Sequence, residues 1–186
     1  MRYKADITAG SLKVAESRVV ADLLLRKIDR DDWRKAIFED NVLQARNPAT
    51  ARRLSRLIHG RLETMGPGLW RLLRDGTATV AAHAALAAAI KHSRLLGDFL
   101  DLAVREQYRL YGVSLSNSLW NDYLEACRGR DPEMPAWNES TKRRLRSSVF
   151  QILAQAGYIE NSRSEPILNF CLPTFQSTTP ASAYAM

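Results

Sequence analysis

The sequence predicts a mainly α-helical protein, built as a helical bundle with a C-terminal winged-helix-like element. Two observations favour this fold class. Apolar residues recur at helical spacing through most of the 186 residues, and after Gly157 the spacing changes to the alternation typical of short strands. With 46% apolar residues, the chain has the length and composition to bury a sizeable core.

The chain starts with a helix expected over residues 12–28, for which Ser11 is the expected N-cap. A second helix is expected over residues 31–46, because two aspartates at its start suit the positive end of a helix dipole. Its apolar stripe is predicted to include Trp33 and Phe38. Both helices therefore have one face that should be buried.

Asn47 and Pro48 are expected to end the second helix and to start a third, over residues 48–65, since asparagine is a good N-cap and proline fits a first helical turn. A tight turn between two such helices predicts a helix-turn-helix at residues 31–65, with a basic second helix. Arg61 projects toward the apolar side of that helix.

Gly66, Pro67 and Gly68 form the clearest break in the first half of the chain. The alanine-rich segment that follows is expected to be the central helix of the bundle, because small side chains allow neighbouring backbones to approach closely. Further helices are predicted over residues 69–74, 77–92, 93–111 and 115–127, and an extended loop over 128–137.

The predicted helix at residues 140–156 has polar capping residues at its start, a buried apolar stripe and a glycine at its end. Two strand-like runs follow, at residues 158–160 and 167–172, joined by a turn-rich segment. A helix that runs into a β-hairpin has the outline of a winged helix. We therefore expect a helical domain at 1–112, a winged-helix-like domain at 113–173 and an extended tail at 174–186.

Positive charge is concentrated in two segments of the chain, whose formal net charge is +7. Residues 44–61 contain five arginines and no acid, and residues 140–147 contain one lysine and three arginines and no acid. These two segments carry the whole excess, which favours an anionic partner.

The outward face of the helix at 140–156 has the chemistry for DNA binding. Arginine and glutamine can bond base edges in a major groove, whereas lysine, arginine and serine can bond phosphates. The same face of a basic helix could instead be simply solvated, and the helix-plus-hairpin context is what favours nucleic acid. The predicted DNA-binding residues are Lys142, Arg143, Arg144, Arg146, Ser147, Gln151 and, at the tip of the wing, Arg163.

The helix at residues 48–65 is a second candidate surface, although any amphipathic hairpin in a bundle would give the same pattern. The candidate DNA-binding residues here are Arg52, Arg53 and Arg56 on this helix and Arg46 just before it.

Catalytic, metal and cofactor sites find no support in the sequence. The three histidines lack metal-ligand spacing on one helix, and the chain has no glycine-rich phosphate loop after a strand and no nucleophile motif. Cys127 and Cys171 form no Cys-x-x-Cys pair, which favours a reduced, intracellular setting. We also expect no signal peptide and no membrane span, since the most apolar run, residues 78–90, is too short to cross a bilayer.

The opening run from Tyr3 to Leu12, continuing through residues 15–18, resembles the start of the small BrxA-type proteins of bacteriophage exclusion (BREX) defence systems. The overall length, the helix with Trp33 and the closing Gly157-Tyr158-Ile159 fit that family as well. The resemblance implies a cytoplasmic bacterial protein without enzymatic activity, working beside larger methyltransferase, ATPase and phosphatase-like components. The family has been likened to NusB, a helical RNA-binding antitermination factor.

Three functional hypotheses follow. The first is a non-enzymatic accessory protein that binds double-stranded DNA, mainly through phosphates and with modest sequence specificity. The second is a NusB-like protein that binds RNA. The third is a protein adaptor that holds other components of the defence system.

Overall fold

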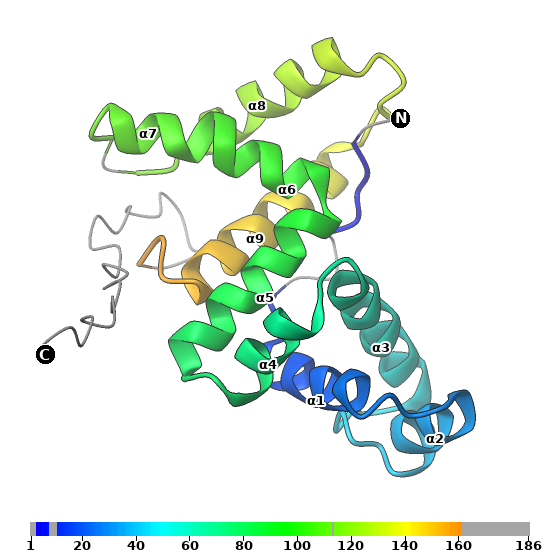
Figure 1. The fold of residues 1–186 in the computed structure, drawn as a ribbon. Helices are drawn as coiled ribbons and strands as arrows, with labels where there is room; N and C mark the ends of the chain where they lie inside the picture. The colour runs from blue at the N-terminus through cyan, green and yellow to red at the C-terminus, as the bar shows by residue number, and fades with distance from the viewer. Residues whose placement is uncertain (1–2, 8–10, 113, 161–186) are drawn as a thin grey trace, which may run out of the picture.

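The computed structural model describes residues 3–7, 11–112 and 114–160 of the chain, and these ranges are mainly α-helical (Figure 1). The elements, in chain order, are α1 (Val14–Leu25), α2 (Arg30–Arg34) with a π-helical turn (Lys35–Glu39), α3 (Pro48–Glu63), α4 (Pro67–Asp75), α5 (Ala78–His92), α6 (Arg94–Phe99), a second π-helical turn (Leu100–Val104), α7 (Arg105–Arg109), α8 (Asn117–Arg130) and α9 (Glu139–Gln155).

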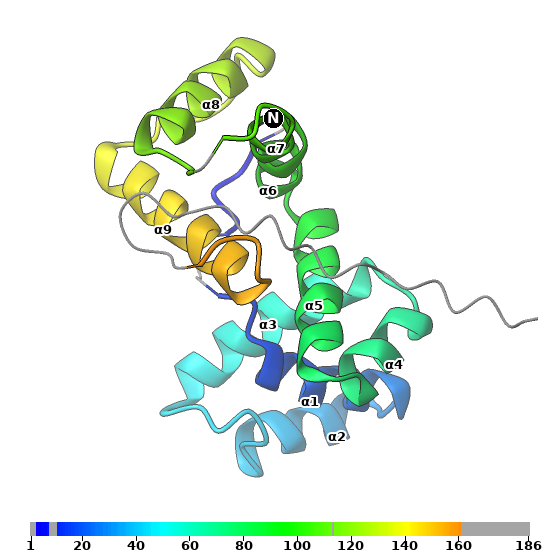
Figure 2. The same cartoon turned by 90° about the vertical axis from the view of Figure 1, so that its left-hand side faces the viewer.

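Helix α5 is the hub of the first half, because it contacts α1, α3, α4 and α6. Its buried residues are almost all alanines, and small side chains let neighbouring helices lie close to its backbone. In Figure 2, α5 lies between α6 above and α4 below. This agrees with the central position predicted for the alanine-rich segment.

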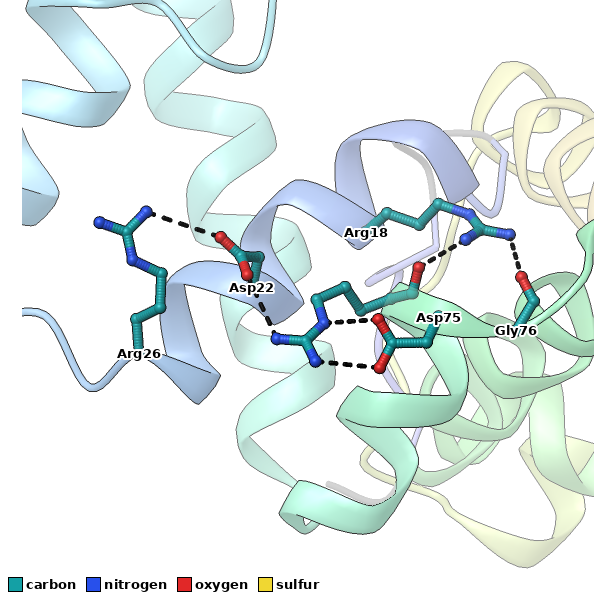
Figure 3. Close-up of polar contacts among 6 residues, drawn as sticks. Arg18, Asp22, Arg26, Asp75 and Gly76 are labelled. Atoms are coloured by element: carbon teal, nitrogen blue, oxygen red, sulfur yellow. Dashed lines mark hydrogen bonds and ion pairs between the residues drawn. The ribbon is translucent and has the colours of Figure 1, made fainter.

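A polar network joins α1 to the end of α4 (Figure 3). The Arg18 guanidinium donates hydrogen bonds of 2.6 Å to the carbonyl oxygens of Arg74 and Gly76, which are among the carbonyls left unpaired where a helix ends. Arg74 in turn pairs with Asp75 at 2.7 Å and with Asp22 on α1 at 3.3 Å. The charges of α1 thus hold α4 in place beside it.

Aromatic side chains pack α6 against α8. The Phe99 ring lies 5.0 Å from the Trp120 ring and 5.1 Å from the Tyr123 ring, centroid to centroid, in edge-to-face arrangements. All three side chains are buried. They belong to one connected hydrophobic core that also includes the inner face of α9.

The first residues of the chain are held by distant partners. The backbone N–H of Tyr3 donates to Asp131 at 3.1 Å, and its hydroxyl donates to Asp98 at 2.8 Å. Ser93 donates to the Asp6 carboxylate at 2.5 Å. The N-terminal segment therefore ties the end of α8 to α6.

The predicted start of the first helix is wrong by two residues. Lys13, not Ser11, precedes the first helical residue, and it has a left-handed backbone conformation with φ of 54°. Ser11 is buried, and the N–H of Leu12 donates to the side chain of Gln155 at 2.7 Å. The residues that the sequence assigned to the helix start are thus held by a hydrogen bond to α9 instead.

The helix predicted over residues 31–46 is also wrong in its second half, since it ends after the π-helical turn at Glu39. Asn41 closes the following loop with its side chain, which accepts from the N–H of Ala45 at 2.9 Å and donates to the carbonyl of the same residue at 3.0 Å. The connection to α3 is therefore longer than the three or four residues usual in a helix-turn-helix.

The predicted wing lies mostly outside the described residues, including the turn, the second strand at 167–172 and the tail at 174–186. Within the described part of the chain, Ile159 has only an isolated β-bridge, as does Ser114. The hairpin of the predicted winged helix thus finds no support in the structure. No helix in the described ranges has both the length and the apolarity needed to cross a bilayer.

Candidate nucleic-acid interface

Helix α9 forms because its end signals and its apolar stripe agree. The Asn138 side chain caps the helix by accepting from the N–H of Thr141 at 2.8 Å. Gly157, with φ of +80°, ends it in the left-handed conformation that favours glycine. The predicted buried stripe is confirmed, because the residues that face the core are at most 6% exposed: Leu145, Val149, Ile152, Leu153 and Ala156.

The opposite face of α9 is open to solvent. Arg143, Arg144, Ser147 and Gln151 are exposed, as the helical spacing predicted. Among the described residues, no carboxylate forms an ion pair with Arg143 or Arg144. Ser147 donates its hydroxyl to the Arg143 carbonyl oxygen at 3.0 Å, so only its lone pairs remain for a ligand.

Two of the predicted cations on α9 are less available. Lys142 and Arg146 are half-buried, and Lys142 donates to Glu139 at 2.7 Å. This hydrogen bond, together with the positive charges of Lys142, Arg143 and Arg128, holds the pKa of Glu139 below its usual range. Glu139 therefore stays ionised and offsets the charge of Lys142, which leaves Arg143 and Arg144 as the main cationic groups of this face.

Helix α3 carries the second basic surface. It begins as predicted, with the Asn47 side chain accepting from the N–H of Thr50 at 2.8 Å and proline at the first helical position. The four predicted arginines are exposed, and in the described ranges no ion pair to a carboxylate involves any of them: Arg46, Arg52, Arg53 and Arg56. Figure 2 shows that α3 and α9 both begin on the left side of that view, with α9 above α3.

Arg61 differs from the other α3 arginines because it is buried, with only 3% of its surface exposed. It donates to the Ser11 carbonyl oxygen at 3.2 Å. Burial lowers its pKa to about 10, while the negative charge of Asp6 acts in the opposite direction. Arg61 is therefore a structural residue and adds nothing to the outward surface.

The sequence assigned Trp33 and Phe38 to the buried stripe of the second helix. Trp33 is half-buried and packs against the hydrophobic core, whereas Phe38 is exposed, and both line a cavity together with arginines of α3. Phe38 is 37% exposed, and the Arg52 guanidinium carbon lies 5.7 Å from the centre of its ring. Ile37 next to it is fully buried. The interleaving of aromatic and basic residues between 33 and 56 is the signal that could have indicated this cluster.

Arg163 lies outside the described residues, so its predicted contact stays a prediction. Metal ligands do not gather anywhere in the described ranges, where no three His, Cys, Asp or Glu side chains lie close enough to hold an ion. The histidines of α5 instead contact backbone: His83 Nε2 lies 3.1 Å from the Ala156 carbonyl oxygen, and His92 Nδ1 lies 3.1 Å from that of Gly60.

Comparison with known proteins gives consistent matches. The family model described as BrxA matches residues 1–177 of the chain. The chain is 55% identical over 163 residues to the BREX protein BrxA of Paramagnetospirillum magneticum (strain ATCC 700264 / AMB-1), which covers 88% of this chain and 82% of that protein. It is 30% identical over 158 residues to the BREX protein BrxA of Escherichia coli O9:H4 (strain HS), covering 85% of this chain and 74% of that protein.

A solved structure shares the fold as well. The crystal structure of an uncharacterized protein from Magnetospirillum magneticum superposes with a TM-score of 0.82 at 52% sequence identity. The match covers 90% of this chain and 85% of that one. The helical arrangement described above therefore recurs in an experimentally solved relative.

Proposed function

Because the chain belongs to the BrxA family, we propose that it is a non-enzymatic, cytoplasmic accessory protein of a BREX phage-defence system that binds double-stranded DNA. Other BREX components are its proposed protein partners. The observation that carries the DNA-binding part is the pair Arg143 and Arg144, exposed on α9 and without ion-pair partners among the described residues.

The chemistry of this face suits the backbone of a duplex better than its bases. The guanidinium groups of Arg143 and Arg144 can each donate two parallel hydrogen bonds to phosphate oxygens, and a single α-helix fits the major groove. Gln151, about two turns further along the same face, is the one predicted residue whose amide matches the edge of adenine. Most contacts would therefore be to phosphate, and sequence preference would be modest.

Helix α3 supports the proposal as a second positive surface. The three exposed arginines of α3 and the exposed arginine just before it would bind phosphates of the same duplex or of a neighbouring turn: Arg52, Arg53, Arg56 and Arg46. Arg163 would add a phosphate or minor-groove contact from beyond the described residues. Such binding releases counterions, so the affinity should fall steeply with salt.

The test is a gel shift with a duplex of about two helical turns, comparing the wild type with Arg143→Glu/Arg144→Glu. We expect the double reversal to weaken duplex binding about tenfold or more at low salt, because phosphate contacts dominate such affinities. The matched control is Arg105→Glu/Arg109→Glu, which changes the net charge equally at two exposed arginines of α7 that already pair with acids. This control should bind DNA almost as the wild type does.

Competition separates the remaining hypotheses. A structured RNA of equal length that displaces the duplex at lower concentration would favour the RNA-binding alternative, for which the likeness to NusB stays a prediction. Equal binding by the wild type and the Arg143→Glu/Arg144→Glu variant would contradict the DNA interface. In that case a changed pull-down of other BREX components would favour the adaptor.

A further inference from the structure

A cavity of about 460 Å³ opens between the π-helical turn after α2 and the outer face of α3. We call it the α3 pocket. Its aromatic side is formed by Trp33 and Phe38, and its polar side comes from α3 residues spaced by four, three and four positions, which places them on one helix face: Arg52, Arg56, His59 and Glu63. The volume lies within the range of small-molecule sites, roughly 300 to 1,000 Å³.

The aromatic side of the pocket is both held in place and accessible. The Trp33 ring meets the His59 ring edge-to-face, with centroids 5.2 Å apart and planes at 87°, so neighbouring groups fix its orientation. Phe38 is 37% exposed, one of the few large apolar side chains in the described ranges that remain so open. An aromatic ring that stays exposed beside a cavity provides a surface on which a flat ring can stack.

The polar side of the pocket is positively charged. Arg52 lies against the Phe38 ring at 5.7 Å, and within the described part of the chain neither Arg52 nor Arg56 has an ion pair with a carboxylate. Glu63 is 3.7 Å from His59 and remains 72% exposed at the rim. The pocket thus combines stacking surfaces with two guanidinium groups that have no anion to bind.

This combination selects a ligand that has both a flat aromatic part and an anionic part. Inorganic phosphate would leave the aromatic rings unused, and an uncharged aromatic compound would leave the guanidinium groups unused. Base pairs inside a duplex are stacked on each other and cannot offer a free face to Phe38. An unpaired nucleotide satisfies both sides of the pocket.

We propose that the α3 pocket binds one unpaired nucleotide, with its base against Trp33 and Phe38 and its phosphate on Arg52 and Arg56. The nucleotide is either free in solution or part of a single strand, because both present the same base and phosphate. The site is separate from the duplex contact proposed for α9. Arg52 and Arg56 belong both to this pocket and to the second basic surface proposed for duplex binding. Phe38 belongs to the pocket alone, so a substitution there tests nucleotide binding without changing the duplex contacts.

The test uses titration calorimetry of the full chain with three probes: deoxyadenosine monophosphate, deoxyadenosine and a six-nucleotide oligodeoxyadenylate. We expect saturable binding of the monophosphate or the oligonucleotide. Phe38→Ala should weaken it by about fivefold or more, which is the low end of a lost base–aromatic stack. Arg52→Ala should weaken it by a similar factor. Leu72→Ala, which truncates an exposed apolar side chain on α4, is the matched control and should leave binding unchanged.

The probes also identify the source of the nucleotide. Tight binding of the monophosphate itself indicates a free nucleotide, whereas binding of the oligonucleotide alone indicates a single strand. The proposal is overturned if neither the monophosphate nor the oligonucleotide binds. It is also overturned if the Phe38→Ala and Arg52→Ala variants bind these probes as tightly as the wild type does, or if deoxyadenosine binds as tightly as its monophosphate. Phe38→Ala should leave duplex binding intact, and Arg143→Glu/Arg144→Glu should leave nucleotide binding intact, so each proposal can fail without the other.

Discussion

Arg61 shows how one residue departs from the pattern of its helix. It lies in a segment of five arginines, yet it is 97% buried and one of its terminal nitrogens, Nη2, has no hydrogen-bond partner. Taking a guanidinium out of water is costly, and the lowered pKa of about 10 reports that cost. The negative charge of Asp6 offsets part of it. The two residues therefore depend on each other.

We predict that Arg61→Met lowers the free energy of unfolding by about 1 kcal/mol at pH 7, because it removes one of the positive charges that offset the partly buried Asp6 carboxylate. Burial already raises the pKa of Asp6, while the Ser93 hydrogen bond and the charges of His92 and Arg61 lower it. Without Arg61 the folded-state pKa of Asp6 rises further. When the pKa of a carboxyl group is higher in the folded than in the unfolded state, its contribution to stability is fully present at pH values below the unfolded-state pKa. That contribution is lost as the pH rises through the folded-state pKa.

The loss in Arg61→Met should therefore be smaller at pH 4 than at pH 7, as measured by urea unfolding at both values. Adding Asp6→Asn should recover part of the stability at pH 7, since the unpaired charge is then gone. A loss that is the same at both pH values, with no recovery in the double variant, would contradict the coupling of Asp6 and Arg61.

Asn138 is the residue that fixes the start of the candidate interface helix. We predict that Asn138→Ala destabilises the protein by about 1 kcal/mol, the usual cost of losing an N-cap side chain, because the N–H of Thr141 loses its acceptor. Asn121→Ala, at an exposed position inside α8, is the control. Denaturant unfolding should show the loss for Asn138 alone, and equal effects of the two substitutions would argue against the cap.

At the scale of elements, α9 was predictable because all of its determinants are local. The cap, the apolar spacing and the terminating glycine lie within twenty residues of one another, so the sequence predicted both the buried stripe and the exposure of Arg143 and Arg144. In the region of α2, the apolar spacing and the actual backbone conformation do not agree. A π-helical turn changes the angle between successive side chains, and it leaves Ile37 buried but Phe38 exposed. Helical spacing alone therefore misassigned Phe38, whereas Trp33 does pack, half-buried, against the core.

Neighbouring positions on α9 give a direct test of its orientation. We predict that Ile152→Ala costs about 2 to 5 kcal/mol of unfolding free energy, because Ile152 is fully buried and its truncation leaves a cavity. Gln151→Ala, one position earlier on the exposed face, should change it by no more than about 0.5 kcal/mol. Thermal or urea unfolding measures both. Similar losses would mean that α9 is rotated or that its outer face is covered.

At the scale of the whole molecule, contacts between distant residues decide what the sequence could not. Tyr3 and Asp131 are 128 positions apart, and no local spacing predicts that the N-terminal segment should cross from α8 to α6. Similarly, the exposed side chain of Gln155 on α9 accepts a hydrogen bond from the backbone N–H of Leu12, 143 positions away. Contacts between Phe99 and Trp120 also cross the predicted boundary between residues 112 and 113, and the division into two domains there stays a prediction.

The charge distribution of the whole molecule is the basis of the central claim. Charge clusters are visible in a sequence, but only the fold shows which cations remain available. Two cations of the basic segments are not available for a ligand, because Arg61 is buried and Lys142 is paired with Glu139. Exposed arginines on α9 and α3 remain, and both helices begin on the same side of the molecule in Figure 2. A duplex that contacts both helices would bind several of these arginines through its phosphates at the same time.

The salt dependence of duplex binding tests this claim most directly, because the slope of log K against log salt concentration counts the phosphates that the protein neutralises. We predict that Arg143→Ala/Arg144→Ala reduces the magnitude of that slope by about two, roughly one for each lost phosphate contact, while Arg105→Ala/Arg109→Ala leaves it unchanged. An unchanged slope in the α9 variant would contradict the proposed interface.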